Sequence, residues 1–300
     1  MKLHYLLPVV FITTLATTIG QKDNTESPLN ASYTHQPDSD IDDGGELSTE
    51  TFSVRLGLPI SRKPGRFIAL TARYDWTDFE FSGTTPGSFG TLDPWDEVHA
   101  LRLSLPVFWD LNDQWTLFAL PNIRFSFEDG ADVGDGLTGG ALIGGAFQWS
   151  DTLTIGPGLG VNSNLEDNAS IFPIIYIDWQ LSDSLRLTTR PSGGPVSGPG
   201  LTLHWRLADA WHASFGANYE KLRFRLDEDN AAAPEGIGEY RGLPVYASLG
   251  YQASEHLRIN AFAGVRLANE LRLEDHGGHT VAKEDSDPAP FFGAGLSLHF

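Results

Sequence analysis

The chain has 300 residues and a formal net charge of −19 at pH 7, which disfavours nucleic-acid binding through a basic surface. It has no cysteine, so a disulfide framework and a thiolate metal site are both excluded. The 32 glycines and 18 prolines are scattered, and no long segment has a helical period, so the composition favours one large all-β domain.

The N-terminal stretch MKLHYLLPVVFITTLATTIGQ has the layout of a secretory signal peptide. Lys2 supplies a short positive region, Leu6 to Ala16 forms an apolar core, and small residues lead up to Gly20. The apolar core is too short to span a bilayer. We therefore predict residues 1–20 to be a cleaved signal peptide and residues 21–300 to be the exported domain.

From residue 29 onward, apolar and polar residues alternate over segments of about ten residues, the spacing of membrane-spanning strands. In FIALTARYDW, for example, Leu70 and Trp76 share one parity, whereas Arg73 has the other. The segments with this pattern are 29–35, 51–60, 67–76, 99–107, 115–125, 137–149, 153–161, 171–181, 185–190, 201–207, 211–219, 243–251, 257–267 and 292–300.

The connections between these segments are of two kinds. Short turns are expected at 61–65, 110–113, 150–151, 182–183, 208–209 and 253–255. Longer polar loops, many of them acidic, are expected at 36–46, 82–95, 127–136, 162–170, 191–199, 227–238 and 268–289. We therefore predict a single transmembrane antiparallel β-barrel of about 14 strands, with short periplasmic turns, longer acidic extracellular loops and both termini on the periplasmic side.

Tryptophans lie on the apolar parity beside the short turns. A barrel places such residues in an aromatic girdle at the lipid boundary, whereas a soluble β-sandwich would bury them in a shared core. The predicted girdle consists of Trp109, Trp115, Trp149, Trp179, Trp205 and Trp211. Trp76 and Trp95 lie beside the long loop at 82–95, which follows the hairpin with the turn at 61–65, and we expect them in the opposite girdle.

The chain ends in FFGAGLSLHF, and its final Phe300 resembles the C-terminal phenylalanine of bacterial outer-membrane proteins. That resemblance implies recognition by the barrel-assembly machinery. Over its mature length the chain also resembles an uncharacterised family of predicted outer-membrane barrels, most clearly in SYTHQPDSDIDDGGELSTETFSVRLGLPI. The family implies a barrel surrounded by outer-membrane lipid and lipopolysaccharide, but it has no established activity to carry over.

Parity also assigns a set of arginines to the lumen. They are Arg55, Arg73, Arg102, Arg124, Arg186, Arg190, Arg206, Arg258 and Arg266. Only Asp75, Asp178 and Glu220 are expected as acids on the same face, since most acids lie in the outer loops. Rings of arginine favour anions, so the leading hypothesis is a pore or transporter for small solutes, with anions favoured.

Two other functions remain open. Bulky inward side chains could fill the lumen and leave a non-conducting structural or surface-interaction barrel that acts through its acidic loops. The candidates for such filling are Phe118, Leu120, Tyr176, Tyr246 and Phe262. The third hypothesis is an outer-membrane hydrolase, for which a serine and a histidine must converge near one rim.

The histidines give little support to catalysis, so we expect no enzyme and assign no catalytic residue and no cofactor. His99 has the lipid-facing parity, opposite to Ser104 on the same strand. His204 and His212 are expected in the lumen beside a periplasmic turn, with Ser214 nearby in sequence.

The acidic loops could attract divalent cations and so bridge lipopolysaccharide phosphates. The spacing of Asp38, Asp40 and Asp42 begins like an EF-hand, but Asp43 occupies the glycine position and Thr49 that of the bidentate glutamate. We therefore prefer a solvated loop there.

The loop DHGGH presents Asp275, His276 and His279, which are possible metal ligands by type. The loop is polar and has no regular structure expected around it, so we do not assign a metal site there.

Overall fold

The computed structural model describes residues 29–42, 44–189 and 196–300. The predicted signal peptide at 1–20 and Arg190 lie outside the described residues. Within them, no helix is long and apolar enough to cross a membrane.

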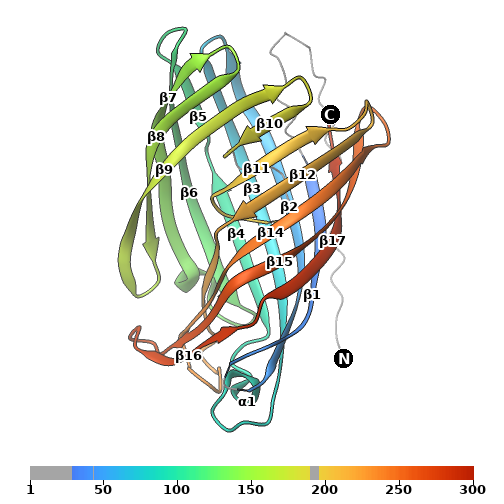
Figure 1. Cartoon of the computed structure of the whole chain (residues 1–300). Coiled ribbons are helices and arrows are strands. Elements are labelled where there is room, and N and C mark those ends of the chain that lie inside the picture. The colour runs from blue at the N-terminus through green and yellow to red at the C-terminus, as the bar shows by residue number, and fades with distance from the viewer. Residues whose placement is uncertain (1–28, 43, 190–195) are drawn as a thin grey trace.

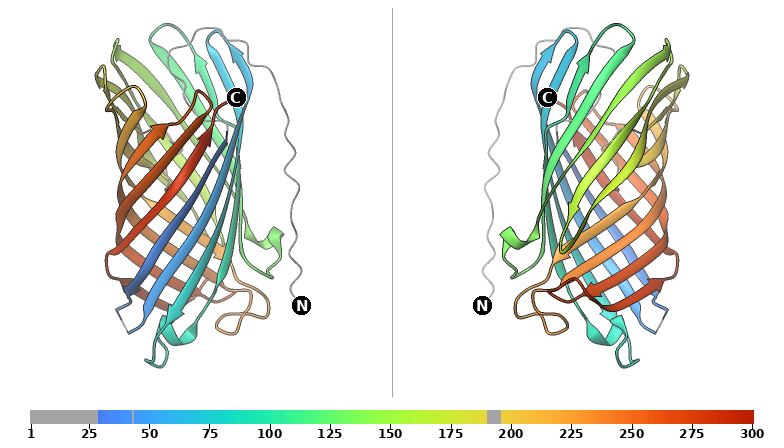
Figure 2. Two further views of the ribbon diagram at one scale, coloured as in Figure 1. Left: turned by 90° about the vertical axis from the view of Figure 1, so that its right-hand side faces the viewer. Right: turned by 90° about the vertical axis from the view of Figure 1, so that its left-hand side faces the viewer.

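The strands form one closed antiparallel barrel, which is seen from three sides in Figures 1 and 2. Strand β1 pairs with β2 on one side and with the last strand, β17, on the other, so the sheet closes on itself. Three strands of the barrel are each divided into two segments, namely β4 and β5, β12 and β13, and β16 and β17. The 17 segments therefore form a barrel of 14 strands, as the alternation predicts. The soluble sandwich is therefore excluded.

The strand bounds are β1 Leu29–Asp40, β2 Glu46–Lys63, β3 Arg66–Ser82, β4 Glu97–Ser104, β5 Val107–Asp110, β6 Trp115–Glu128, β7 Leu137–Ser150, β8 Leu153–Asn164, β9 Asp167–Ser182, β10 Leu185–Thr188, β11 Gly200–Arg206, β12 Trp211–Asn218, β13 Glu220–Arg225, β14 Ile237–Gln252, β15 Leu257–Glu274, β16 Thr280–Ser286 and β17 Ala289–Leu298. Two short helices, α1 Phe89–Leu92 and the 3-10 helix η1 Val133–Gly136, lie in loops.

Short turns join the strands at the end that holds the C-terminus, and α1 lies at the opposite end (Figure 1). We call these the periplasmic end and the outer end. Several strands at the outer end are longer than the sequence predicts. The first strand continues from the predicted 29–35 to Asp40, and the predicted loop at 162–170 is a tight turn at residues 165–166. Most of the predicted loop at 268–289 is the β15–β16 hairpin.

The tryptophans beside the short turns point away from the lumen. Their side chains are exposed on the outer wall in every case, from 40% for Trp115 and Trp179 to 73% for Trp149. A second row of rings crosses five neighbouring strands nearer the outer end, because Tyr33, Phe52, Trp76, His99 and Phe127 are consecutive partners in the sheet. The two rows are ten residues apart on β3, where Arg66 pairs with Trp109 and Trp76 with His99.

We expect quenching by brominated lipid to distinguish tryptophans on the outer wall from a tryptophan inside the barrel. In single-tryptophan variants, Trp149 fluorescence should be strongly quenched, because its ring lies on the lipid-facing wall. Trp95, which is 2% exposed, should keep its emission. Equal quenching of the two would contradict the assignment of Trp149 to the lipid-facing wall and of Trp95 to the interior.

Beyond the second aromatic row, the alternation reverses with respect to the lumen. On β3, Asp78 and Glu80 follow the lipid-facing parity of Trp76, whereas Phe79 and Phe81 pack into an interior apolar cluster. The outer end of the barrel thus has polar residues outside and an apolar core inside, as a water-soluble protein has.

The barrel also narrows at this end. Arg225 of β13 forms a parallel bridge with Phe127 of β6, although β7 to β12 lie between these strands in the sheet order. The tip of the β8–β9 hairpin is attached to β13 as well: Arg223 donates to the Leu165 carbonyl at 2.7 Å and Arg225 pairs with Glu166 at 2.7 Å. The narrowed end is small enough for loop side chains to fill.

Candidate functional site

Four arginines form a continuous row across neighbouring strands in the middle of the barrel. Arg55 of β2 is directly opposite Arg73 of β3, Arg73 is opposite Arg102 of β4, and Arg102 is opposite Arg124 of β6. Directly opposite side chains have Cβ atoms only about 5 Å apart, and like charges in such pairs destabilise a sheet. The row is therefore an unfavourable arrangement unless negative charge compensates it.

Three arginines of this row, with Arg266 of β15, line a cavity of about 90 Å³. Its wall comes from β1, β2, β3, β4 and β6 on one side and from β13, β14, β15, β17 and residues 196–198 on the other. The other lining residues are Thr34, Thr49, Thr51, Asp75, Thr77, Phe79, Val98, Ala100, Val196, Ser197, Gly198, Glu220, Lys221, Leu222, Tyr240 and Phe291.

The two carboxylates of the cavity already have partners. Arg73 Nε donates to both oxygens of Asp75, at 2.8 and 2.9 Å, and Ser53 donates to the same carboxylate. Glu220 pairs with Arg266 at 2.5 Å, and the Arg266 guanidinium lies 5.0 Å from the centre of the Tyr240 ring. Each acid thus neutralises one arginine.

Among the residues that the structure describes, Arg102 and Arg124 have no carboxylate partner. Arg124 donates to the Lys221 carbonyl at 3.2 Å, and within residues 29–42, 44–189 and 196–300 no acid pairs with it. Over the same residues, Arg102 makes neither a hydrogen bond nor an ion pair. Lys221 itself pairs at 3.1 Å with Glu239, a carboxylate that it shares with Arg223. The cavity therefore carries two uncompensated guanidinium charges.

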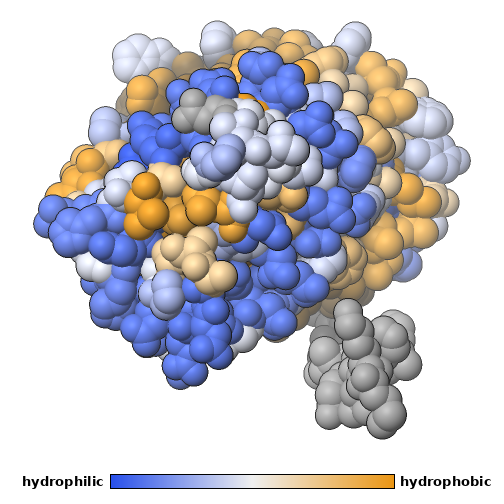
Figure 3. All heavy atoms as spheres, turned by 90° about the horizontal axis from the view of Figure 1, so that it is seen from below, coloured by the Kyte–Doolittle hydropathy of each residue, from blue (hydrophilic) through white to orange (hydrophobic). Residues whose placement is uncertain are grey.

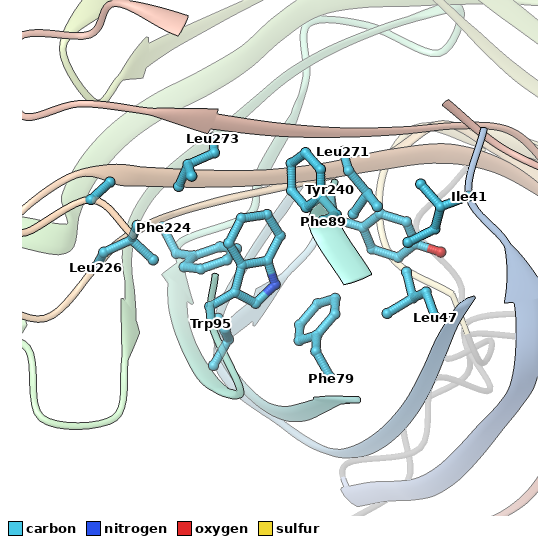
Figure 4. Packing of buried hydrophobic residues seen from close by; sticks show 12 residues of the cluster. Ile41, Leu47, Phe79, Phe89, Trp95, Phe224, Leu226, Tyr240, Leu271 and Leu273 are labelled. Atoms are coloured by element: carbon cyan, nitrogen blue, oxygen red, sulfur yellow. The ribbon is translucent and has the colours of Figure 1, made fainter. Parts of the chain in front are cut away.

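An apolar plug lies on the outer side of the cavity (Figure 4). It consists of Ile41, Leu47, Phe79, Phe89, Trp95, Val98, Phe224, Leu226, Ala233, Tyr240, Leu271 and Leu273. The Trp95 ring is at its centre, with ring centroids of Phe89 and Phe224 at 5.6 and 5.2 Å. In the space-filling view of the outer end, the described residues show no open channel (Figure 3). The plug fills the interior of the barrel at this end.

The plug corrects the sequence prediction for Trp95. The residue was expected in an outer girdle, but the β3–β4 loop folds inward and carries Phe89 and Trp95 into the barrel mouth. Gly90 permits this fold, because a Cβ there would lie 2.4 Å from the Ser82 carbonyl oxygen. Asn230 ties the loop to the opposite wall by donating to the Pro94 carbonyl at 2.7 Å. No periodic signal marks an inward-folded loop.

A second buried cluster, of Val196, Tyr246, Phe262 and Phe291, lies toward the periplasmic end. Phe262 is four residues nearer the periplasmic turn than Arg266 on β15, and Val196 and Phe291 also line the cavity. Of the bulky residues expected in the lumen, Phe118, Tyr246 and Phe262 are buried, and Leu120 and Tyr176 are half-buried. The cavity is thus bounded by apolar side chains in both directions along the axis.

Comparison with known proteins assigns a family. Residues 29–299 match the family described as a domain of unknown function, DUF6268. The chain belongs to this family. The resemblance to a family of outer-membrane barrels is thereby confirmed, and the DUF6268 match brings no activity with it.

Among solved structures, this DUF6268 barrel is similar to a FadL homologue of Pseudomonas aeruginosa, with 14% identity, a TM-score of 0.44, and coverage of 91% of this chain and 89% of that one. It is similar to an outer-membrane channel of Pseudomonas putida F1, with 10% identity, a TM-score of 0.47, and coverage of 94% and 100%. It is also similar to the Pseudomonas putida toluene transporter TodX, with 9% identity, a TM-score of 0.40, and coverage of 93% of this chain and 90% of that one. No curated protein matches the chain.

The remaining predicted arginines of the DUF6268 barrel lie nearer the periplasmic end. Arg186 forms a two-bonded pair with Asp178, at 2.7 Å for each bond. Arg258 donates to the Gln252 side chain at 3.0 Å, and Arg206 donates to the Asp183 carbonyl at 2.8 Å. These arginines are not part of the cavity lining.

The residues considered for hydrolysis do not assemble into a catalytic group. Ser214 Oγ is 2.6 Å from Ser248 Oγ, and within the described chain neither His204 nor His212 is hydrogen-bonded to Ser214. His99 is on the outer wall, where Tyr74 is its hydrogen-bond partner at 2.8 Å. The expectation against an enzyme remains a prediction.

The loop residues considered for metal binding are engaged in turn formation. Asp275 accepts from the backbone N–H groups of Gly277 and His279, which lowers the pKa of its carboxyl, while His276 lies 3.2 Å from Glu235. The segment with Asp38 and Asp40 belongs to β1 rather than to a loop. Over residues 29–42, 44–189 and 196–300, no group of three or more potential ligands could hold a metal ion.

Proposed function

We propose that this DUF6268 barrel is a gated channel of the bacterial outer membrane that passes small anionic solutes. The observation that carries the proposal is the arginine row, in which Arg102 and Arg124 face a cavity without carboxylate partners. Uncompensated positive charge inside a low-dielectric wall attracts anions and repels cations.

The plug supplies the gate in this proposal. Phe89 and Trp95 belong to a loop that is held by side-chain packing, by the Asn230 contact and by a hydrogen bond from the Phe89 N–H to the Glu284 carboxylate at 3.1 Å. A loop can move without breaking the ladder hydrogen bonds of the barrel, so opening requires a local rearrangement only.

The test is planar-bilayer recording of the refolded chain under a KCl gradient. We expect rare openings with a reversal potential toward that of chloride. Openings that reverse on the potassium side would show that the charge assignment is wrong. If neither the native chain nor variants with a disrupted plug conduct, the channel itself is wrong.

The second candidate function is a non-conducting surface barrel, and the two apolar clusters are the observation that favours it. It would act through the acidic outer loops, with lipopolysaccharide and divalent cations as its partners. It predicts no conductance even after the plug is removed, so the same recordings distinguish it from the channel.

Insertion through the barrel-assembly machinery is a further proposal, in which Phe300 is the recognised residue. This phenylalanine is 59% exposed at the periplasmic end. We expect Phe300→Ala to reduce the amount of heat-modifiable barrel in outer-membrane fractions, whereas the neighbouring His299→Ala should have little effect. Equal amounts in the two variants would rule out the proposed recognition.

A further inference from the structure

We propose that the cavity between the plug and the second cluster is a binding site for a small divalent oxyanion, such as inorganic phosphate, held between Arg102 and Arg124. The inference rests on the lumen location used in the proposed function and names the ligand class. It depends on three features of the cavity: its charge, its hydrogen-bond donors and its size.

The charge of the site calls for a dianion. Asp75 and Glu220 are each committed to one arginine, and Lys221 is paired with Glu239. The guanidiniums that remain are those of Arg102 and Arg124, which leaves two positive charges. A buried charge without a partner has lost its hydration without compensation, and two adjacent like charges repel each other as well. One bound dianion would remove both penalties.

The donors suit an oxyanion. Arginine presents a planar fork of N–H groups that matches two oxygens of phosphate or sulfate, whereas a halide offers only one acceptor atom to the whole fork. Arg102 and Arg124 come from directly paired positions, so a single tetrahedral anion could bridge their two forks. Thr49 and Thr77 line the same cavity, and the Thr77 hydroxyl is hydrogen-bonded to the Thr51 hydroxyl at 3.2 Å.

The size of the cavity limits the ligand. At about 90 Å³ it is smaller than the roughly 150 Å³ cavity that holds a benzene molecule in an engineered protein. A phosphate or sulfate fits this space. The volume therefore suits a small inorganic oxyanion.

The experiment measures binding of inorganic phosphate to the whole refolded barrel in detergent, by calorimetry and by the thermal unfolding midpoint. We expect saturable binding and a raised midpoint with phosphate or sulfate, and no comparable effect of chloride at equal ionic strength. Glycerol 3-phosphate tests whether a phosphate group on a small organic body can also enter.

Substitutions of the two arginines test whether phosphate binds at this site. Arg102→Gln and Arg124→Gln should each weaken phosphate binding at least about tenfold, because each removes a charge-assisted contact. In phosphate-free buffer the same variants should unfold at the native temperature or above it, since they remove repulsion. The matched control is Arg206→Gln, outside the cavity, which should leave phosphate binding unchanged.

Three results would overturn the inference. They are equal binding of chloride and phosphate, phosphate binding that persists in both variants, or an equal loss of binding in the Arg206→Gln control. If the opened barrel conducts anions but phosphate does not bind, the site is wrong and the channel stands. If phosphate binds but no variant conducts, the channel is wrong and the site stands.

Discussion

The double variant Phe89→Ser, Trp95→Ser is expected to turn a nearly silent barrel into a frequently open one. Both aromatic rings lie in the plug and come from the same inward-folded loop. Truncating a buried aromatic residue costs about 3–5 kcal/mol of packing, and serine adds a polar group that favours hydration. The barrel wall should persist, because its ladder hydrogen bonds do not involve these side chains.

Single-channel recording measures the effect, and we expect the open probability to rise by at least about tenfold, which corresponds to about 1.4 kcal/mol of the lost packing. The matched control is Trp149→Ser, which removes the same kind of ring from the lipid-facing wall, where it is 73% exposed. Heat-modifiable gel mobility would show that each variant has folded. If a folded double variant stays as silent as the control, the plug is not what closes the lumen.

The second large effect is expected from Arg102→Glu in that opened background. The substitution replaces a positive charge of the cavity by a negative one beside Arg124. Two unit charges 4 Å apart interact by about 4 kcal/mol at an effective dielectric constant of 20. Even a fraction of this energy should lower the chloride-to-potassium permeability ratio by about tenfold.

Reversal potentials under a KCl gradient report this ratio directly. Arg206→Glu is the control, because it makes the same charge change near the periplasmic turns, outside the cavity lining. Selectivity that changes equally in the two variants would mean that overall charge, and not the arginine row, sets the preference. Unchanged selectivity in Arg102→Glu would mean that the arginine row does not line the conduction path.

The sequence predicts the transmembrane part of the wall well, because lipid on one side and a polar lumen on the other impose a strict period of two. On β3 the parity of Leu70 and Trp76 predicts Arg73 to face the lumen, and the strand predicted at 67–76 lies within β3, which continues to Ser82. What parity cannot supply is the register between strands, which depends on turn geometry and on irregularities such as the shift between Pro59 and Ser61. The alignment of Arg73 with Arg102 therefore became visible only in the structure.

The outer end was predicted less well, for a different physical reason. Strands that continue into water have polar outward residues, so their composition resembles that of loops, as at 162–170 and 268–289. One signal was present in WTDFEFS, where the apolar residues Phe79 and Phe81 have the lumen-facing parity and the acidic Asp78 has the lipid-facing parity. Such a change of parity within a single strand indicates where hydrocarbon ends. The inward path of Trp95 had no comparable signal.

The reversal of polarity along β3 also determines how the protein fits its bilayer. β2 contains 18 residues and β3 contains 17, yet only the part of each between the two aromatic rows meets acyl chains. Ten tilted residues span about 25 Å, the height of the apolar band of outer-membrane barrels. The strand length therefore does not set the hydrophobic thickness to which this barrel is matched. The remainder of each long strand can extend beyond the bilayer surface without any hydrophobic mismatch.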